Sequence, residues 1–367
     1  MKRYFYDPAV SAPLPFLKDS GIPIYLYGMG NGAEKALTYL ARHGLAPAGV
    51  FASDGYVRGQ SFSGFPVLSL SAVAQKEPDG FAAVVAFGCS GEDARRLFSR
   101  VRESGGIVFL PDLPLFGEEG TDDTFLKEKE GEISSARSLF RDPDSLRLFD
   151  ALLRYKRTQT PEDLFRAVLP PDRLFSLFDP ASVRKAVDGG AYRGDTAAEM
   201  IARFPALSEI LCFEPDPASF RRLELFSDPR VRLRCYRAGL YSDNGELPFS
   251  GGGNRGAHFG QTEKGAARVL ALDSLSEAAG CDYFKLDVEG CEKEALLGAK
   301  NRIRRDRPVL SLSVYHRAGD LFSLPLLLAG LCADYRLFLS RADVSPAWDI
   351  TLTAIPNEKL KGAPAHG

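Results

Sequence analysis

The sequence predicts an α/β protein, and three observations lead to this expectation. Short apolar runs alternate with amphipathic stretches in two separate parts of the 367-residue chain. In each part a glycine-rich turn follows the first apolar run, and an acidic residue follows the second. Gly28 precedes Asp54 by 26 positions, and Gly189 precedes Glu214 by 25. Strands and helices that alternate in this way predict two tandem Rossmann-like units, each with a doubly wound parallel sheet.

The first unit is expected over residues 1–117, as an accessory domain with a nucleotide-type fold. Its expected strands are 24–27, 49–53, 81–88 and 107–111, and its expected helices are 33–43, 71–75 and 92–103. Residues 1–21 carry three prolines and are expected to be irregular. The turn has the pattern G-x-G-x-x-A, formed by Gly28, Gly30 and Ala33, and Asp54 lies near the usual ribose position. A bound NAD, a bound nucleotide-sugar and an empty scaffold used for docking all remain open.

A helical connector is expected over residues 118–180. Helical stretches lie around residues 133–140 and 145–155. Residues 160–163 have the form of a helix start, with Thr160 as the cap and Pro161 at the first helical position.

The second unit is expected over residues 181–367. Its expected strands are 183–188, 209–215, 231–237, 282–288, 308–315, 335–339 and 349–355. Only about ten residues separate the last two strands, too few for a crossover helix, so these strands should pair antiparallel as a terminal hairpin. The glycine-rich residues 250–260 are expected to form a loop between strands.

Composition excludes several classes of protein. Hydrophobic residues make up 45% and charged residues 26%, which excludes disorder of the whole chain. The net charge of -2 argues against a nucleic-acid partner. Apolar stretches fall well short of the roughly 20 residues that span a bilayer, and the N-terminus lacks an apolar secretory segment, so we expect a cytoplasmic protein without a membrane partner. The six cysteines show no paired spacing and are expected to be reduced thiols. The oligomeric state stays open, with a homodimer as one alternative.

Three carboxylates stand where a ligand of an α/β sheet would bind. Glu214 is followed by Pro215, which cannot continue a strand ladder, so its carboxylate is presented at a strand end, where it can accept hydrogen bonds from two ribose hydroxyls. Asp287 and Glu289 lie in the motif KLDVEG (285–290) directly after an apolar strand. Alternation along the strand predicts that both point to the same side of the sheet edge. Glu289 has a second interpretation as the cap of the following helix.

These motifs together resemble one family. The resemblance rests on VDGGAYRGDT (187–196), FEPDP (213–217), LDSL (272–275), YFKLDVEGCEKEALLGAK (283–300) and the strand that leads to His316. From about residue 183 to 356 the chain resembles the FkbM family of S-adenosylmethionine-dependent methyltransferases. The resemblance implies a class I methyltransferase fold in the second unit. It also implies a cofactor site formed by Asp188, Gly189, Gly190, Gly194, Asp195, Thr196, Glu214, Asp216, Ser242 and Asp243.

The family resemblance implies transfer of a methyl group from S-adenosylmethionine to a hydroxyl of a small molecule, with a sugar or a glycan precursor as the expected acceptor. An alcohol is a poor nucleophile at neutral pH, so a base or a metal is expected. We predict His316 as the general base or as the group that orients the acceptor, with Asp287 and Glu289 ordering the site. A magnesium or calcium ion held by Asp287 and Glu289 is the rival arrangement.

Two other functions remain as alternatives. The first unit could bind NAD(P) and act as an oxidoreductase, although no Tyr-x-x-x-Lys pattern follows its glycine turn. The chain could also be a non-catalytic nucleotide-binding protein.

Overall fold

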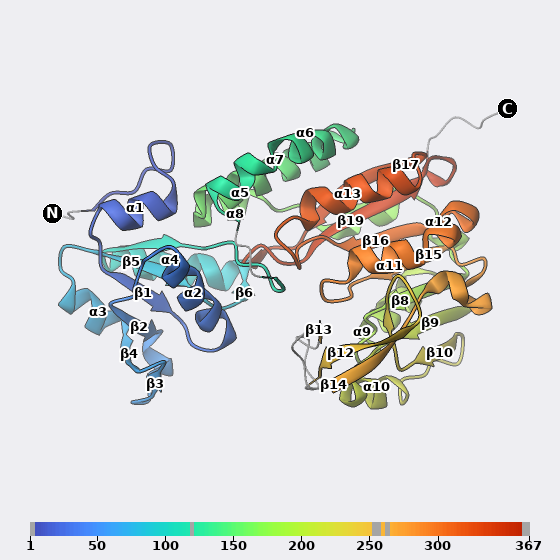
Figure 1. Ribbon diagram of the computed structural model, residues 1–367, viewed down its shortest axis with the longest axis horizontal. Helices are drawn as coiled ribbons and strands as arrows, with labels where there is room; N and C mark the ends of the chain where they lie inside the picture. The colour runs from blue at the N-terminus through green and yellow to red at the C-terminus, as the bar shows by residue number, and fades with distance from the viewer. Residues whose placement is uncertain (1–3, 118–120, 252–257, 261–264, 362–367) are drawn as a thin grey trace.

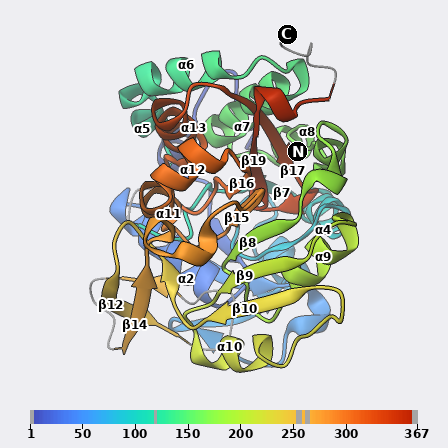
Figure 2. The same cartoon turned by 90° about the vertical axis from the view of Figure 1, so that its right-hand side faces the viewer.

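The computed structural model describes residues 4–117, 121–251, 258–260 and 265–361. Two α/β units lie side by side, and a group of helices runs along one side of both (Figure 1). Seen from the end of the second unit, the first unit lies behind it (Figure 2). The α/β class predicted from the sequence is confirmed. None of the helices in the described ranges has the length and apolarity needed to span a membrane.

The first unit contains a six-stranded sheet in the order β3-β4-β2-β1-β5-β7. Its strands are β1 (Ile24–Tyr27), β2 (Gly49–Ala52), β3 (Ser61–Phe62), β4 (Phe65–Ser69), β5 (Phe81–Val85) and β7 (Gly106–Phe109). All neighbours are parallel except β3 and β4. Every residue of β1 and β5 is buried, because helices cover both faces of a central parallel strand. The sequence did not predict β3 and β4, which are half exposed and lack a long apolar run.

Helices of the first unit begin at residues that favour helix starts. They are α1 (Pro13–Asp19), α2 (Asn31–Arg42), α3 (Leu70–Lys76) and α4 (Gly91–Glu103). The Ser90 hydroxyl accepts a hydrogen bond from the backbone N–H of Asp93 and caps α4. Residues 1–21 were expected to be irregular, and this is wrong for α1. A proline at the first helical position is compatible with a helix, since its missing N–H has no partner there anyway.

Four helices connect the two units: α5 (Asp123–Glu128), α6 (Glu130–Leu139), α7 (Pro143–Thr158) and α8 (Pro161–Arg166). Thr160 caps α8 by accepting from the backbone N–H of Asp163, and Pro161 is the first helical residue, as the sequence predicts. The Tyr155 hydroxyl of α7 donates to the Leu110 carbonyl of the first unit at 3.0 Å. At the other end of α7, the Ser145 hydroxyl accepts from the backbone N–H of Leu339 at 2.9 Å. These helices therefore pack against both units.

The second unit contains a seven-stranded sheet in the order β10-β9-β8-β15-β16-β19-β17. Its strands are β8 (Lys185–Gly189), β9 (Glu209–Phe213), β10 (Arg232–Tyr236), β15 (Tyr283–Leu286), β16 (Val309–Ser313), β17 (Tyr335–Arg341) and β19 (Ile350–Pro356). The first five in this order are parallel, and β19 runs antiparallel between β16 and β17. Parallel order places the carboxyl ends of β8, β9 and β15 at one edge.

Helices flank this second sheet: α9 (Asp195–Arg203), α10 (Pro217–Leu223), α11 (Glu292–Gly298), α12 (Lys300–Asp306) and α13 (Asp320–Leu331). Short 3-10 helices also occur in the described parts of the chain: η1 (Asp54–Tyr56), η2 (Pro171–Ser176), η3 (Pro180–Ser182), η4 (Leu272–Ser274), η5 (Ser276–Ala278) and η6 (Asn357–Lys359).

A four-stranded sheet, β11-β14-β12-β13, extends from the second unit. Its strands are β11 (Gly239–Leu240), β12 (Gly245–Ser250), β13 (His258–Phe259) and β14 (Gly265–Leu270). The predicted loop over residues 250–260 is wrong at His258 and Phe259, because the Phe259 ring packs 4.9 Å from the ring of Phe249 and β13 pairs with β12. Residues 252–257 lie outside the described residues.

A short pair of strands joins the two units directly. β6 (Cys89–Ser90) of the first unit pairs antiparallel with β18 (Val344–Ser345) of the second. Beside them, Arg95 forms an ion pair with Asp343 at 2.7 Å. One continuous hydrophobic core includes Phe81 of the first unit, Phe149 of α7 and Phe284 of the second unit.

Candidate active site

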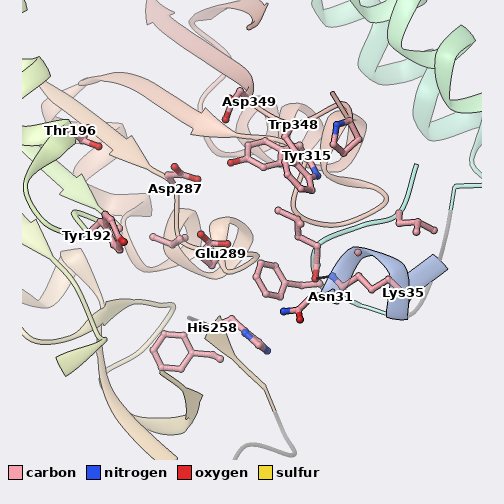
Figure 3. Close-up of a pocket in the computed structure, with 18 of the residues that line it drawn as sticks. Asn31, Lys35, Tyr192, Thr196, His258, Asp287, Glu289, Tyr315, Trp348 and Asp349 are labelled. Carbon is pink, nitrogen blue, oxygen red and sulfur yellow. Dashed lines mark hydrogen bonds between the residues drawn. The ribbon is translucent and has the colours of Figure 1, made fainter. Parts of the chain in front are cut away.

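A cavity of about 900 Å³ lies between the two units, and both units supply its walls (Figure 3). The first unit contributes Asn31 and Lys35 of α2 together with Leu110, Pro111, Leu113, Leu115 and Phe116. The second unit contributes the carboxyl edge of its main sheet, which is where ligands of open α/β sheets bind.

The turn after β8 needs its glycines. A Cβ on Gly190, which has φ +82°, would lie 2.0 Å from the carbonyl oxygen of Asp287. A Cβ on Gly194, with φ +93°, would lie 2.8 Å from the Phe226 ring. The turn therefore passes very close to the loop after β15, and Gly190, Asp195 and Thr196 line the cavity.

Two acidic residues at the ends of β8 and β9 have raised pKa values. Glu214 lines the cavity, and its two carboxylate oxygens accept from the backbone N–H groups of Tyr192 at 2.9 Å and Asp216 at 2.8 Å. Burial raises the pKa of Glu214 to about 7, because the charged form loses water. Burial likewise raises the pKa of Asp188 to about 6, although Lys285 opposes the shift.

Six of the ten predicted cofactor residues are not among the lining residues of the cavity: Asp188, Gly189, Gly194, Asp216, Ser242 and Asp243. The carboxylate of Asp216 accepts from the backbone N–H groups of Ala218 and Ser219 and so caps α10. Ser242 and Asp243 follow β11 and form a hydrogen bond with each other at 2.9 Å. Leu240 lines the cavity next to them.

The loop after β15 brings two carboxylates to one histidine. His316 Nε2 lies 3.5 Å from Asp287 Oδ1 and 3.5 Å from Glu289 Oε2. Alternation along a strand does not explain this convergence, since β15 ends at Leu286 and Glu289 has φ +52° in the left-handed region. The expectation that Glu289 caps the next helix is wrong, because α11 begins after Cys291 without a side-chain cap.

His316 is buried, with 1% of its side chain exposed, and its Nδ1 lies 2.8 Å from Glu292 Oε1. Burial lowers the pKa of His316, but Glu292, Asp287 and Glu289 outweigh burial and raise it to about 9. A raised pKa favours the protonated imidazole, so the role of His316 as general base stays a prediction. Its predicted role as an orienting group is compatible with the geometry.

The two carboxylates next to His316 differ in acidity. Burial tends to raise the pKa of Asp287, but Lys285 and His316 lower it to about 2. Burial raises the pKa of Glu289 to about 7. Lys285 Nζ lies 3.4 Å from Asp287 Oδ2 and 3.8 Å from Asp188 Oδ1.

Residues 188–343 match the family model described as the Methyltransferase FkbM domain. This segment includes the glycine turn, Glu214, the loop of Asp287 and Glu289, and His316. Residues 188–343 therefore form an FkbM methyltransferase domain. No curated protein matches the chain.

Solved structures extend the similarity beyond the FkbM domain. The methyltransferase FkbM from Methylobacillus flagellatus KT has a TM-score of 0.69 at 19% identity, over 91% of this chain and 90% of that chain. At this identity the likeness shows a shared fold, which spans both units. The O-methyltransferase NcsB1 of neocarzinostatin biosynthesis (13% identity, 63% and 61% coverage) and human N-acetylserotonin methyltransferase (12% identity, 63% and 69% coverage) have TM-scores of only 0.28.

Sequence reasoning missed several residues around the FkbM domain's site. Lys285 and Glu292 flank the predicted acidic pair in the same motif, and a lysine inside an apolar strand is a usable signal for a buried ion pair. Trp348 and Asp349 reach the cavity from the segment before β19 (Figure 3), and no local pattern marks them.

An aromatic side chain packs on the glycine turn of the first unit. A Cβ on Gly28 would lie 2.7 Å from the ring of Phe87, a residue that follows β5, the strand next to β1 in the sheet. Asp54 Oδ1 accepts from the backbone N–H of Leu70 at 3.1 Å. Gly28, Gly30, Ala33 and Asp54, the residues of the predicted second nucleotide site, are not among the lining residues of the cavity.

Proposed function

We propose that the chain is an S-adenosylmethionine-dependent O-methyltransferase whose small-molecule acceptor binds between the two units. One observation carries this proposal. A single cavity contains Glu214 at the end of β9 and the carboxylates of Asp287 and Glu289 after β15. A ribose-binding carboxylate and an acceptor-binding cluster therefore face the same space.

The residues present fit the cofactor. Each carboxylate oxygen of Glu214 accepts one backbone N–H and retains a lone pair for a ribose hydroxyl. Helix α9 begins at the cavity without a side-chain cap, and the lack of a Cβ at Gly190 allows the close turn. For the methionine end we propose the turn residues of the sequence expectation, Asp188, Gly189, Gly190, Gly194, Asp195 and Thr196.

The chemistry asked of the chain is to position an acceptor oxygen and to remove its proton. The cofactor would supply an activated methyl group: a bond from oxygen to methyl forms, the sulfur–methyl bond breaks, and its electron pair stays on sulfur. Asp287 and Glu289 both line the cavity, and Glu289, whose pKa is raised to about 7, is the better placed of the two to receive the hydroxyl proton. His316, held by Glu292, positions both of them.

The walls favour a polyhydroxylated acceptor such as a sugar or a glycan precursor. Tyr315, Trp348 and Phe116 present aromatic surfaces to the cavity, and Glu289 and Asp349 add carboxylates (Figure 3). Aromatic faces pack on the apolar faces of a sugar ring, while carboxylates accept from its hydroxyls.

The same proposal includes an organisation of the chain into an accessory domain (1–117), a helical connector (118–180) and a methyltransferase domain (181–367), with two tandem Rossmann-like sheets. We propose a cytoplasmic enzyme with neither nucleic acid nor membrane as partner, which the net charge of -2 supports. An oxidoreductase acting through the first unit is disfavoured because Gly28, Gly30, Ala33 and Asp54 are not among the lining residues of the cavity.

Calorimetry on the intact chain tests the proposal. We expect S-adenosylmethionine to bind with a 1:1 stoichiometry, NAD and NADH not to bind, and a labelled methyl group to appear on members of a panel of free and nucleotide-linked sugars. The absence of S-adenosylmethionine binding would reject the proposal, and binding of NADH alone would support the oxidoreductase.

A further inference from the structure

We propose that Asp287, Glu289 and His316 bind one divalent cation at the floor of the cavity. The role of this cation in catalysis rests on the proposed function, whereas its binding follows from the geometry of the three side chains alone. The cation would lie among Asp287 Oδ1, Glu289 Oε2 and His316 Nε2.

The distances from His316 Nε2 are compatible with a shared cation, and Asp287, Glu292 and His316 offer ligand atoms that all lie within 4.8 Å of one another. Nε2 lies 3.5 Å from each of the two carboxylate oxygens. A cation with ligand distances of about 2.1 Å holds neighbouring ligand atoms about 3.0–3.4 Å apart. A direct N–H···O hydrogen bond would need about 2.7–3.2 Å, so the observed separation fits a bridging ion better than a direct bond.

The buried ring nitrogen Nε2 of His316 also points to a bound cation. Its Nε2 is buried and has no hydrogen-bond partner among the residues that the structure describes. A buried polar atom without a partner is costly, and a bound cation would satisfy it. Because Nδ1 lies 2.8 Å from Glu292 Oε1, the proton of a neutral imidazole belongs on Nδ1 and the lone pair of Nε2 points toward Asp287 and Glu289. A carboxylate that holds the far nitrogen is the usual outer partner of a metal-binding histidine.

The local charge also favours a cation. Three carboxylates, those of Asp287, Glu289 and Glu292, surround the imidazole within 3.5 Å. Lys285 Nζ lies 3.4 Å from the other oxygen of Asp287, Oδ2. Oδ1 is therefore the oxygen that faces the imidazole. Oδ1 accepts one hydrogen bond from the Ser313 hydroxyl at 2.7 Å and retains a second lone pair for a metal.

The position of the proposed cation next to the cavity determines how it enters and what it can contact. Asp287 and Glu289 line the cavity, so a cation can enter from it and can contact an acceptor hydroxyl there (Figure 3). Two carboxylates and one imidazole suit a divalent first-row ion such as Mn²⁺, and contact with such an ion makes a hydroxyl more acidic.

Titration of the chelator-treated full chain with Mn²⁺ tests the site. Free Mn²⁺ is counted by electron paramagnetic resonance, and Trp348, the single tryptophan of the chain, reports from the same cavity by fluorescence. We expect one equivalent to bind. Glu289→Gln should weaken binding at least about tenfold, and Glu292→Gln about 10–100-fold through the imidazole. His43→Gln is the matched control, because His43 faces Asp122 at 3.9 Å in a similar pair away from the cavity.

The outcomes separate the two proposals. Wild-type chain that binds S-adenosylmethionine but shows no saturable Mn²⁺ binding overturns the cation and leaves the methyltransferase proposal intact. Equal Mn²⁺ affinity in the wild type and in Glu289→Gln, with native circular dichroism in both, also overturns the cation site. Mn²⁺ binding that is lost in Glu289→Gln and retained in His43→Gln supports it, even in a chain that fails to bind S-adenosylmethionine.

Discussion

Glu214 and Asp287 are carboxylates at the same edge of one sheet, yet their surroundings shift their pKa values in opposite directions. Glu214 is buried beside Asp188 and Asp216, and its pKa rises to about 7. Asp287 is also desolvated, but Lys285 and His316 lower its pKa to about 2. At the residue scale, the neighbours of each group therefore decide which carboxylate responds to pH near neutrality.

We predict that S-adenosylmethionine affinity depends on the protonation of Glu214. A raised pKa means that the carboxylate gains a proton as the pH falls through about 7, and a protonated oxygen accepts one hydrogen bond fewer. The dissociation constant should therefore rise roughly tenfold per pH unit below about pH 7. Glu214→Gln should weaken binding by about 1–3 kcal/mol and remove this dependence.

Calorimetry at several pH values measures this effect. Glu209→Gln is the control, because Glu209 begins the same strand and pairs with Lys185 and Arg234 away from the cavity. A pH dependence that persists in Glu214→Gln would show that another group is responsible.

At the element scale, two turns with similar sequence patterns pack against different kinds of neighbours. The β8–α9 turn lies against the loop of Asp287, so that a Cβ at Gly190 would collide with the backbone. The β1–α2 turn is covered by the Phe87 ring at Gly28. The strand–glycine–helix pattern predicts both turns, but the packing around each turn decides which of its residues reach the cavity: Asn31 and Gly32 in the first unit, and Gly190, Asp195 and Thr196 in the second.

Gly190→Ala should disrupt the cofactor turn beyond the cost of its backbone conformation. Gly280 has φ +69°, and no atom lies within 4 Å of the position that a Cβ would take there, so Gly280→Ala isolates the conformational penalty of about 1–3 kcal/mol. Gly190→Ala should lower the free energy of unfolding by this amount and by a further 1–3 kcal/mol or more from overpacking. The same variant should also lose S-adenosylmethionine binding. Urea unfolding and calorimetry measure both. Equal stabilities of the two variants would contradict the close approach to Asp287.

At the scale of the whole molecule, the helices between the units are part of both cores. Leu148, Phe149 and Leu152 of α7 are buried in the core that also contains Leu339 of β17. Lys35 of α2 donates to the carbonyl oxygens of Pro114 and Leu115, and so holds a first-unit segment that lines the cavity. The acceptor half of the cavity thus depends on both units.

We therefore predict that a fragment of residues 170–367 does not fold cooperatively, because it exposes the apolar surface of β17 that α7 covers. A fragment of residues 121–367 keeps α5–α8 and should unfold in a single transition. Circular dichroism during urea denaturation distinguishes the two. Cooperative unfolding of the shorter fragment, with full affinity for S-adenosylmethionine, would show that α7 is dispensable.

Sequence reasoning identified most elements of both main sheets, since buried strands are continuous apolar runs and Thr160 and Pro161 mark a helix start locally. It failed where the signal is not local. The small sheet depends on pairing of β12 with β13 and β14, and the half-exposed β3 and β4 lack an apolar run. Asp216, which the sequence predicts as a cofactor residue, caps α10.

The α/β class, the methyltransferase resemblance and the carboxylates at the strand ends follow from the sequence alone, because periodicity and motif spacing are local properties of the chain. What those groups do depends on the folded arrangement around them. The pKa of His316 rises to about 9 because Glu292, Asp287 and Glu289 come together around it. Segments as distant as Asn31 and Trp348 meet across one cavity, since packing of the two units, which no local pattern encodes, brings them there.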